Sequence, residues 1–120
     1  MKRTLSLNQN TLFRRLYYRG KVYHSRIAVL HVLPNRSSVN RLGLTVGKKV
    51  GNAVIRNRVR RLLRESYRLR EESLKTGFDL VLVAKAEAVG KPFSEVDSNV
   101  FYLLRKAQLL NCEDDEKIIT

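Results

Sequence analysis

Hydrophobic residues recur with helical spacing in some segments of the chain and with strand spacing in others. Turn and breaker residues separate these segments, most clearly at Gly20, Pro34 and Gly77. The pattern predicts six elements in the order helix, strand, strand, helix, strand, helix, at residues 8–19, 22–33, 41–46, 53–73, 78–84 and 94–110.

The three strand segments indicate how the chain folds. Residues 22–33 and 41–46 are joined by a short turn, so we expect them to pair as antiparallel neighbours. Residues 78–84 form a largely apolar run, typical of a strand that is buried on both faces. One sheet with helices packed on it makes an α+β sandwich, and 120 residues without a linker are enough for a single domain.

The two ends of the chain set the expected limits of that domain. We expect one domain over residues 1–112 and an acidic tail over residues 113–120 that frays from it. The N-terminus lacks the apolar stretch of a secretory signal, and no apolar run approaches the roughly 20 residues that cross a bilayer. Cys112 is the single cysteine, so it forms no disulfide within the chain. These features favour a cytoplasmic protein that does not enter a membrane.

Charge is distributed very unevenly between the two halves. Residues 1–64 contain 16 Lys or Arg and no Asp or Glu, whereas residues 65–120 contain 8 basic and 11 acidic residues. A folded half without carboxylates repels itself, and a bound polyanion relieves that repulsion. The apolar stripes are committed to a core rather than to an exposed membrane-binding face, so nucleic acid is favoured over an anionic membrane.

The segment 53–73 carries the strongest functional signal. At 100° per residue, its apolar positions fall within an arc of about 120° that we expect to face the core: Ile55, Val59, Leu62, Leu63 and Leu69. Five arginines fall on the opposite side, with Asn57 among them: Arg56, Arg60, Arg61, Arg64 and Arg68. Glu65 can neutralise only one of them by an intrahelical pair. Guanidinium groups bind phosphate oxygens bidentately, so this face favours phosphate binding over a merely solvated surface.

The loop before this helix supports the same interpretation. Gly47, Gly51 and Asn52 permit close approach of the backbone, and Lys48 and Lys49 place positive charge where a helix N-terminus already attracts anions. The glycines do not have the spacing of a nucleotide-binding Walker loop. Loop and helix together predict a site that binds a phosphate backbone.

The run from Lys48 to Glu65, KKVGNAVIRNRVRRLLRE, resembles the signature of the bacterial ribonuclease P protein family. That family is marked by an Arg-Asn-Arg sequence, which stands here at residues 56–58. The resemblance covers about residues 5–110. It implies an αβββαβα two-layer sandwich, similar to that of ribosomal proteins, with a central sheet and an unusual left-handed βαβ crossover, a hand that connection statistics disfavour.

The resemblance also implies a function. The family's protein joins a catalytic RNA, and the complex removes the 5′ leader from precursor tRNA. The RNA carries out the hydrolysis with Mg²⁺ and holds most of that metal, so no catalytic residue, metal ligand or obligate protein partner is expected for the protein. The residues expected to bind the catalytic RNA are Lys48, Lys49, Asn52, Arg56, Asn57, Arg58, Arg60, Arg61, Arg64 and Arg68.

A second surface is implied for the single-stranded leader. Phe13 and Tyr17 lie one helical turn apart; their pattern alone favours a place in the core, but Phe13 matches the family's cleft aromatic, with Tyr17 beside it. Strand alternation puts Val29 and His31 on one face, and Thr45 is expected on the neighbouring strand. We therefore expect these five residues to line a leader-binding cleft.

One other function stays open from the residues alone. A ribosomal or structural RNA-binding protein has the same size and basic composition, and it would bind folded RNA without changing its processing. A nuclease that cuts by itself is disfavoured, because neither His24 nor His31 has the carboxylate or cysteine neighbours of a metal or general-base site.

Overall fold

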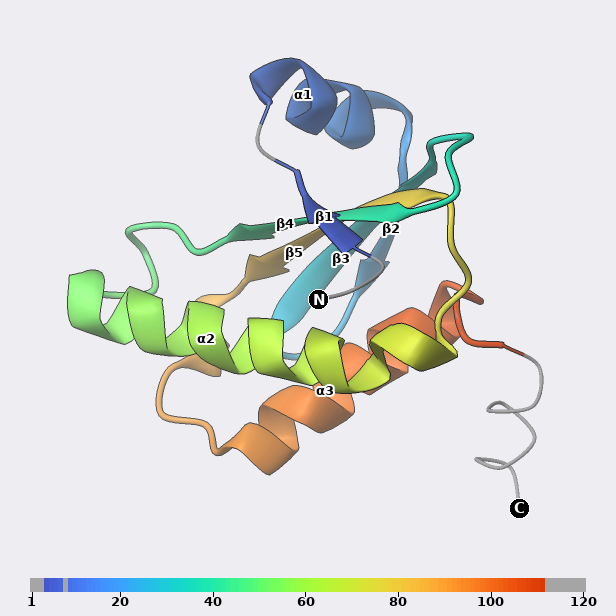
Figure 1. Cartoon of the computed structure of the whole chain (residues 1–120). Helices are drawn as coiled ribbons and strands as arrows, with labels where there is room; N and C mark the ends of the chain where they lie inside the picture. The colour runs from blue at the N-terminus through green and yellow to red at the C-terminus, as the bar shows by residue number, and fades with distance from the viewer. Residues whose placement is uncertain (1–3, 8, 112–120) are drawn as a thin grey trace.

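The computed structural model describes residues 4–7 and 9–111, and in it a mixed five-stranded sheet carries helices on both faces (Figure 1). The strands are β1 (Thr4–Ser6), β2 (Lys21–His24), β3 (Ala28–Pro34), β4 (Asn40–Thr45) and β5 (Phe78–Ala84). The α-helices are α1 (Asn10–Arg19), α2 (Ala53–Arg70) and α3 (Phe93–Lys106), and short 3-10 turns follow α2 and β5, at Glu71–Ser73 and Ala86–Ala88. The α+β class is confirmed.

The order of the strands is β1-β4-β5-β3-β2, so the predicted antiparallel pairing of residues 22–33 with residues 41–46 is wrong. β5 lies between β3 and β4, antiparallel to the first and parallel to the second. Its apolar side chains explain this place, because a central strand is covered on both faces. Residues 22–33 also divide in two: Ser25 bonds to Ala28 through its backbone and side chain, which reverses the chain between β2 and β3.

β4, α2 and β5 form a βαβ unit whose two strands are parallel neighbours, and the crossover has the left-handed sense that the resemblance implies (Figure 1). α2 and α3 cover one face of the sheet, while α1 packs on the other face against β3 and β5. The sheet with α2 and α3 makes the expected two layers, and α1 adds a partial third. Because α1 has 10 residues, it covers only part of its face.

Two clusters of buried side chains hold these layers together. The main core lies between the sheet and the α2–α3 layer, where Leu30, Leu63 and Leu82 are fully buried. A smaller core beneath α1 is centred on Leu16 and Val81, which are fully buried as well. β5 therefore contributes to both cores, with alternate residues facing opposite layers.

The core-facing side of α2 differs from the prediction at one position. Leu69 is 55% exposed, whereas Tyr67 is fully buried. The Tyr67 hydroxyl lies 2.8 Å from Thr4 Oγ1 on β1, so α2 turns this side chain under the edge of the sheet. The residues of β1 were not predicted as a strand, because a three-residue edge strand has no periodic signal.

The end of the described chain also differs from the prediction. α3 ends at Lys106 rather than near residue 110, and Gln108 follows with a φ of 59°. Cys112, the acidic tail at 113–120 and the boundary expected between them lie outside the described residues. Within residues 4–7 and 9–111, no helix combines the length and the apolar character that a membrane span requires.

Candidate nucleic-acid interface

The loop before α2 leads from the end of β4 into the helix. Asn52 is the N-cap of α2, and its Oδ1 accepts a hydrogen bond of 3.0 Å from the backbone N–H of Ile55. Gly51 has a φ of 152°, which L side chains rarely adopt, so this turn requires glycine. The side chains of Asn52, Lys48 and Lys49 are all exposed. The predicted contact residue Asn52 therefore has a structural role in beginning the helix as well.

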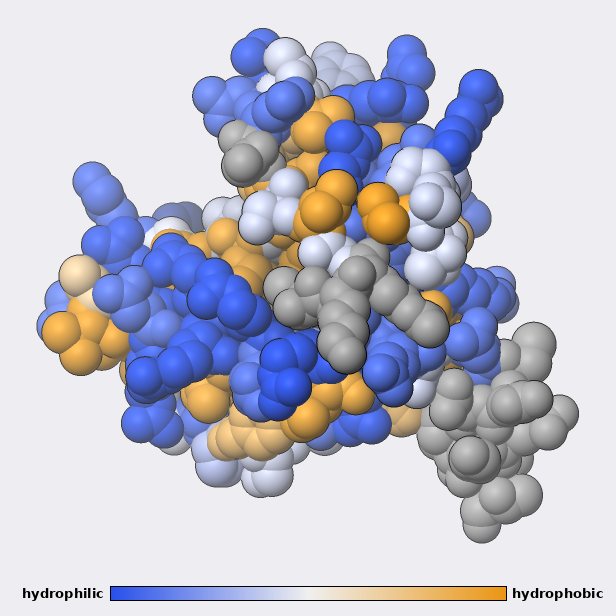
Figure 2. All heavy atoms as spheres, in the orientation of Figure 1, coloured by the Kyte–Doolittle hydropathy of each residue, from blue (hydrophilic) through white to orange (hydrophobic). Residues whose placement is uncertain are grey.

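The arginines of α2 extend from the edge of the sheet to open solvent. Arg58, Arg61 and Arg64 are exposed, whereas Arg56 and Arg60 are half-buried. Figure 2 shows hydrophilic residues over the visible side of this helix. Within the described part of the chain, none of these five arginines forms an ion pair. This face therefore keeps its positive charge available for an external anion.

Three of the predicted RNA-binding residues make side-chain hydrogen bonds within the helix. Arg68 donates to the Glu65 carboxylate from Nε at 3.1 Å and from Nη2 at 2.5 Å, and these hydrogen bonds hold the pKa of Glu65 below its usual value. Asn57 Oδ1 accepts a hydrogen bond of 2.9 Å from Arg60 Nη1. The pairing leaves Arg68 less available to a phosphate than Arg61, which has no acidic partner among the described residues.

Two of the arginines of α2 reach a hollow at the edge of β4. It has a volume of about 240 Å³ and is lined by Ser6, Leu7, Phe13, Leu42, Gly43, Leu44, Arg60 and Arg64. β1 pairs with β4 only as far as Leu42, so the following part of this edge is open toward the hollow. The basic face of α2 and the aromatic residue of α1, predicted as two separate surfaces, therefore meet here.

Two rows of residues in register across β4, β5 and β3 form a floor on the α1 side of the sheet, Gly43–Val81–His31 and Thr45–Val83–Val29. Phe13 lies at one end of the first row, where a Cβ on Gly43 would come within 2.7 Å of its ring; this close approach requires glycine. Tyr17 lies at the other end, with its ring 4.6 Å from that of His31. The three side chains of the second row are partly exposed.

The structure thus brings the five predicted cleft residues to one face of the sheet, with one correction. Thr45 does not lie on the strand next to Val29, because β5 inserts Val83 between them. Phe13 is partly buried and Tyr17 is 44% exposed, with their ring centroids 6.3 Å apart. Both rings are therefore partly accessible from solvent.

His31 sits within this floor in a surrounding that disfavours its charged form. Burial lowers the pKa of His31 below its ordinary value of 6.5, and the positive charge of His24 adds to this effect. Its Nδ1 is buried and has no hydrogen-bond partner among the described residues. The imidazole is therefore neutral at pH 7 and presents an uncharged ring beside Tyr17.

We expect His31 to make the folded protein less stable as the pH falls. Its pKa is lower in the folded than in the unfolded chain, so its contribution is present above pH 6.5 and is lost as the pH falls through the folded value. NMR titration of the imidazole protons should give a midpoint below 6.5 for His31, and the unfolding free energy of His31→Gln should depend less on pH below 6.5. A midpoint at or above 6.5 would contradict this.

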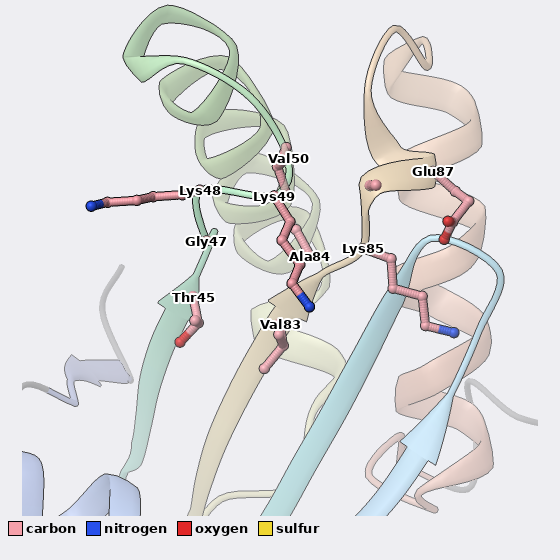
Figure 3. Close-up of a pocket in the computed structure, with 10 residues that line it drawn as sticks. Thr45, Gly47, Lys48, Lys49, Val50, Val83, Ala84, Lys85 and Glu87 are labelled. Carbon is pink, nitrogen blue, oxygen red and sulfur yellow. The ribbon is translucent and has the colours of Figure 1, made fainter.

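Beyond the second row, the ends of β4 and β5 open into a hollow of about 600 Å³ (Figure 3). Its lining comes from both strands, the loop before α2 and the 3-10 turn after β5: Thr45, Gly47, Lys48, Lys49, Val50, Val83, Ala84, Lys85, Ala86 and Glu87. Lys49 extends over the strand ends, while Lys48 points away from them. Lys85 turns aside, and its Nζ donates to the Ser25 carbonyl at 2.7 Å. The floor thus extends from the rings of Phe13 and Tyr17 on α1 to Lys49 at the strand ends.

Three residues of this surface, Val83, Lys85 and Gly43, are not among those predicted from the sequence. Val83 was assigned to a strand buried on both faces, and only the short length of α1 leaves it partly exposed. Lys85 directly follows that strand, and its position at the strand end is the sequence signal that could have identified it. Gly43 carried no sign of its contact with Phe13, because the approach joins segments 30 residues apart. Among the described residues, no group of three or more His, Cys, Asp or Glu side chains is placed to hold a metal ion.

A strongly basic α+β domain with an arginine helix, a sheet floor flanked by two aromatic rings and lysines near the strand ends defines the class of protein: an RNA-binding domain. Residues 1–108 match the family model described as Ribonuclease P. The Ribonuclease P protein component of Clostridium botulinum (strain Langeland) is 45% identical over 106 residues, which are 88% of this chain and 96% of the relative. That of Alkaliphilus oremlandii is 41% identical over 111 residues, 92% and 97% of the two chains.

Solved structures agree with these sequence matches. The RNase P protein of Staphylococcus aureus has a TM-score of 0.82 at 27% identity, over 88% of this chain and 97% of that one. The RNase P protein of Thermotoga maritima has a TM-score of 0.78 at 26% identity, over 84% and 96%. The chain belongs to the ribonuclease P protein family. It is a subunit of the ribonucleoprotein that matures the 5′ ends of tRNA, and its partner is the ribonuclease P RNA. The comparisons lend no support to a ribosomal or purely structural role.

Proposed function

We propose that the chain uses two surfaces that meet at the edge of β4. The arginines of α2 and the lysines of the preceding loop bind the ribonuclease P RNA, and the floor beside α1 binds the single-stranded 5′ leader of precursor tRNA. The observation that carries the proposal is the row Thr45–Val83–Val29, which is partly exposed between the α1 rings and the lysines at the strand ends.

The α2 surface suits the phosphate backbone of a folded RNA. Arg58, Arg61 and Arg64 are exposed without ion pairs in the described part of the chain, and each guanidinium can bind a phosphate through two hydrogen bonds. The N-terminus of α2 adds a favourable field for anions next to Lys48 and Lys49. These contacts supply affinity that does not depend on the base sequence.

The floor beside α1 suits an unpaired strand. Bases can stack on the rings of Phe13 and Tyr17, and the strand's phosphates can pass Lys49 at the far end of the floor. Stacking tolerates any base, because every base has a π-face. A surface of this kind holds leaders of different sequence, as a protein that serves many precursor tRNAs requires.

The proposal leaves the chemistry to the RNA. The proposed contact residues come almost wholly from residues 1–64, which contain no Asp or Glu, and Glu87 is the single carboxylate among the residues that line the hollow at the strand ends. Glu65, the first acidic residue, is tied to Arg68. We therefore assign the Mg²⁺ ions to the RNA, with the bacterial relatives supporting a cytoplasmic place of action.

Phe13→Ala tests the leader site. Because one stacked base contributes about 1–3 kcal/mol, we expect the holoenzyme to bind a precursor with a leader about 5- to 150-fold more weakly. Binding of a substrate without a leader, and assembly of the protein with its RNA, should stay unchanged. The measurement is the dissociation constant at low Mg²⁺ for substrates with and without a leader, together with cleavage by RNA alone, protein alone and both.

Leu12→Ala is the matched control, because Leu12 packs in the same small core beneath α1 without lining the hollow at β4. It should loosen α1 to a similar degree and leave most leader binding intact. If Phe13→Ala and Leu12→Ala weaken all substrates equally, with or without a leader, the assignment of the floor to the leader is wrong.

A further inference from the structure

The side of α1 that faces away from the sheet carries an arginine-rich surface around an exposed aromatic ring. A broad, shallow hollow of about 670 Å³ is lined by Arg14, Arg15, Tyr18 and Arg19. All four residues are exposed, and Tyr18 is 94% exposed. Neither the floor beneath α1 nor the arginine face of α2 includes any of these residues. We call this set the outer face of α1.

The side chains of the outer face are not used within the described part of the chain. None of its three arginines forms an ion pair there, and the side chain of Tyr18 makes no hydrogen bond or ring contact there. Tyr102 on α3 is different: its ring lies 5.5 Å from Lys106 Nζ, which also donates to its hydroxyl at 3.2 Å. An exposed tyrosine elsewhere on this protein thus has an internal partner, and Tyr18 has none among the described residues.

The charge of the outer face favours an anionic partner. Residues 1–64 contain no acidic residue, so α1 and the strands β1 to β4 carry no carboxylate that offsets the three arginines. Asp79 on β5 is buried and paired with Arg41. Figure 2 shows hydrophilic residues around α1 at the top of the molecule. A merely solvated helix face usually mixes both signs of charge. Arginines around an exposed aromatic ring are the combination that binds single-stranded nucleic acid, through phosphate contacts and base stacking.

The outer face continues the path of the proposed leader site around the helix. Successive residues of an α-helix are turned by about 100°, so Arg14 lies between Tyr17 and Tyr18 around the circumference of α1. Tyr17 stands at the edge of the floor, where its ring meets His31. A helix is about 10–12 Å wide with its side chains, so a strand that leaves the floor past Tyr17 needs few nucleotides to reach Tyr18.

We propose that the outer face of α1 is a second single-stranded RNA site, which binds the leader nucleotides that lie beyond those held on the floor. A base stacks on the exposed ring of Tyr18, and Arg14, Arg15 and Arg19 bind the phosphates on either side of it. This site rests on the proposed leader function of the floor. With both sites occupied, the leader wraps around α1. It contacts Phe13 and Tyr17 on the inner side of the helix and Tyr18 on the outer side.

The test compares Tyr18→Ala with the unchanged protein in the holoenzyme, using precursor tRNAs whose leaders have about 4 or about 16 nucleotides, the range of single-stranded sites. We expect about fivefold weaker binding of the long-leader substrate and unchanged binding of the short-leader substrate. Tyr18→Phe should restore binding, because stacking needs the ring and not the hydroxyl. Arg15→Ala should make the plot of log affinity against log salt shallower by about 0.7 for the long-leader substrate. This is the change expected when one phosphate contact on a single strand is lost.

Tyr102→Ala is the matched control, since it removes a partly exposed tyrosine from α3. It should leave binding of both substrates unchanged. The proposal is overturned if Tyr18→Ala leaves the long leader unchanged, or if it weakens both leaders and assembly with the RNA equally. Phe13→Ala in the same series separates the two proposals, because it should weaken both leaders. If Phe13→Ala weakens binding of neither substrate, the assignment of the leader to the floor is wrong. The comparison of Tyr18→Ala with the unchanged protein still tests the outer face.

Discussion

Replacing Arg58 and Arg61 together by Ala is expected to weaken binding of the ribonuclease P RNA by about 100-fold or more at moderate salt. Both side chains are exposed on α2, and neither lines the hollow that contains Phe13. Each loses a charged hydrogen bond to phosphate, which contributes about 1.5–3 kcal/mol. The plot of log affinity against log salt should also become shallower by about 0.9 for each phosphate contact that is lost.

The control is the pair Arg105→Ala and Lys106→Ala on α3, which removes the same two charges from another surface. If this pair of substitutions weakens RNA binding as much as the α2 pair does, the affinity depends on the net charge of the protein and not on the arginine face. Arg60 and Arg64 are less suitable for the comparison, because both line the hollow with Phe13 and their loss could affect RNA and leader together.

Asp79→Ala is expected to lower the free energy of unfolding by about 3–5 kcal/mol. The Asp79 carboxylate is 4% exposed and accepts hydrogen bonds from Arg41 Nε at 2.6 Å and Nη2 at 2.9 Å, and from Asn35 Nδ2 at 3.0 Å. Its removal leaves the partly buried guanidinium of Arg41 without its acceptor, while Asn35 Nδ2 keeps only its hydrogen bond of 3.1 Å to the Val39 carbonyl. The expected loss is large against the total of about 5–15 kcal/mol that is usual for a domain. Urea unfolding of the free protein measures it.

Arg41→Ala and the double variant complete a mutant cycle for this ion pair. The Arg41 side chain is 29% exposed, so losing it should cost less than losing the buried Asp79 carboxylate. The double variant should be less destabilised than the sum of the two, because the partners no longer leave each other unpaired. A loss below about 1 kcal/mol for Asp79→Ala would show that the pair contributes little to stability.

Most helices and strands could be predicted from the sequence because their signals are local. β5 has the predicted bounds, and the long helix begins at Ala53 as predicted. Strand pairing could not be predicted in this way, since alternation in 22–33 is the same whichever strand lies beside it. The exposure of Leu69 and the burial of Tyr67 likewise depend on how α2 meets β1.

The features of the candidate site likewise divide into those set by neighbouring residues and those set by tertiary contacts. The sequence by itself determined the basic half without carboxylates, the arginine face of α2 and the resemblance that points to ribonuclease P, because charge and spacing along one helix are properties of neighbouring residues. Only the tertiary structure decided that Val83 lies between Val29 and Thr45, that Gly43 admits the ring of Phe13, and that Tyr18 faces solvent. The reason is physical: sheet order and helix placement follow from burial of side chains far apart in the chain.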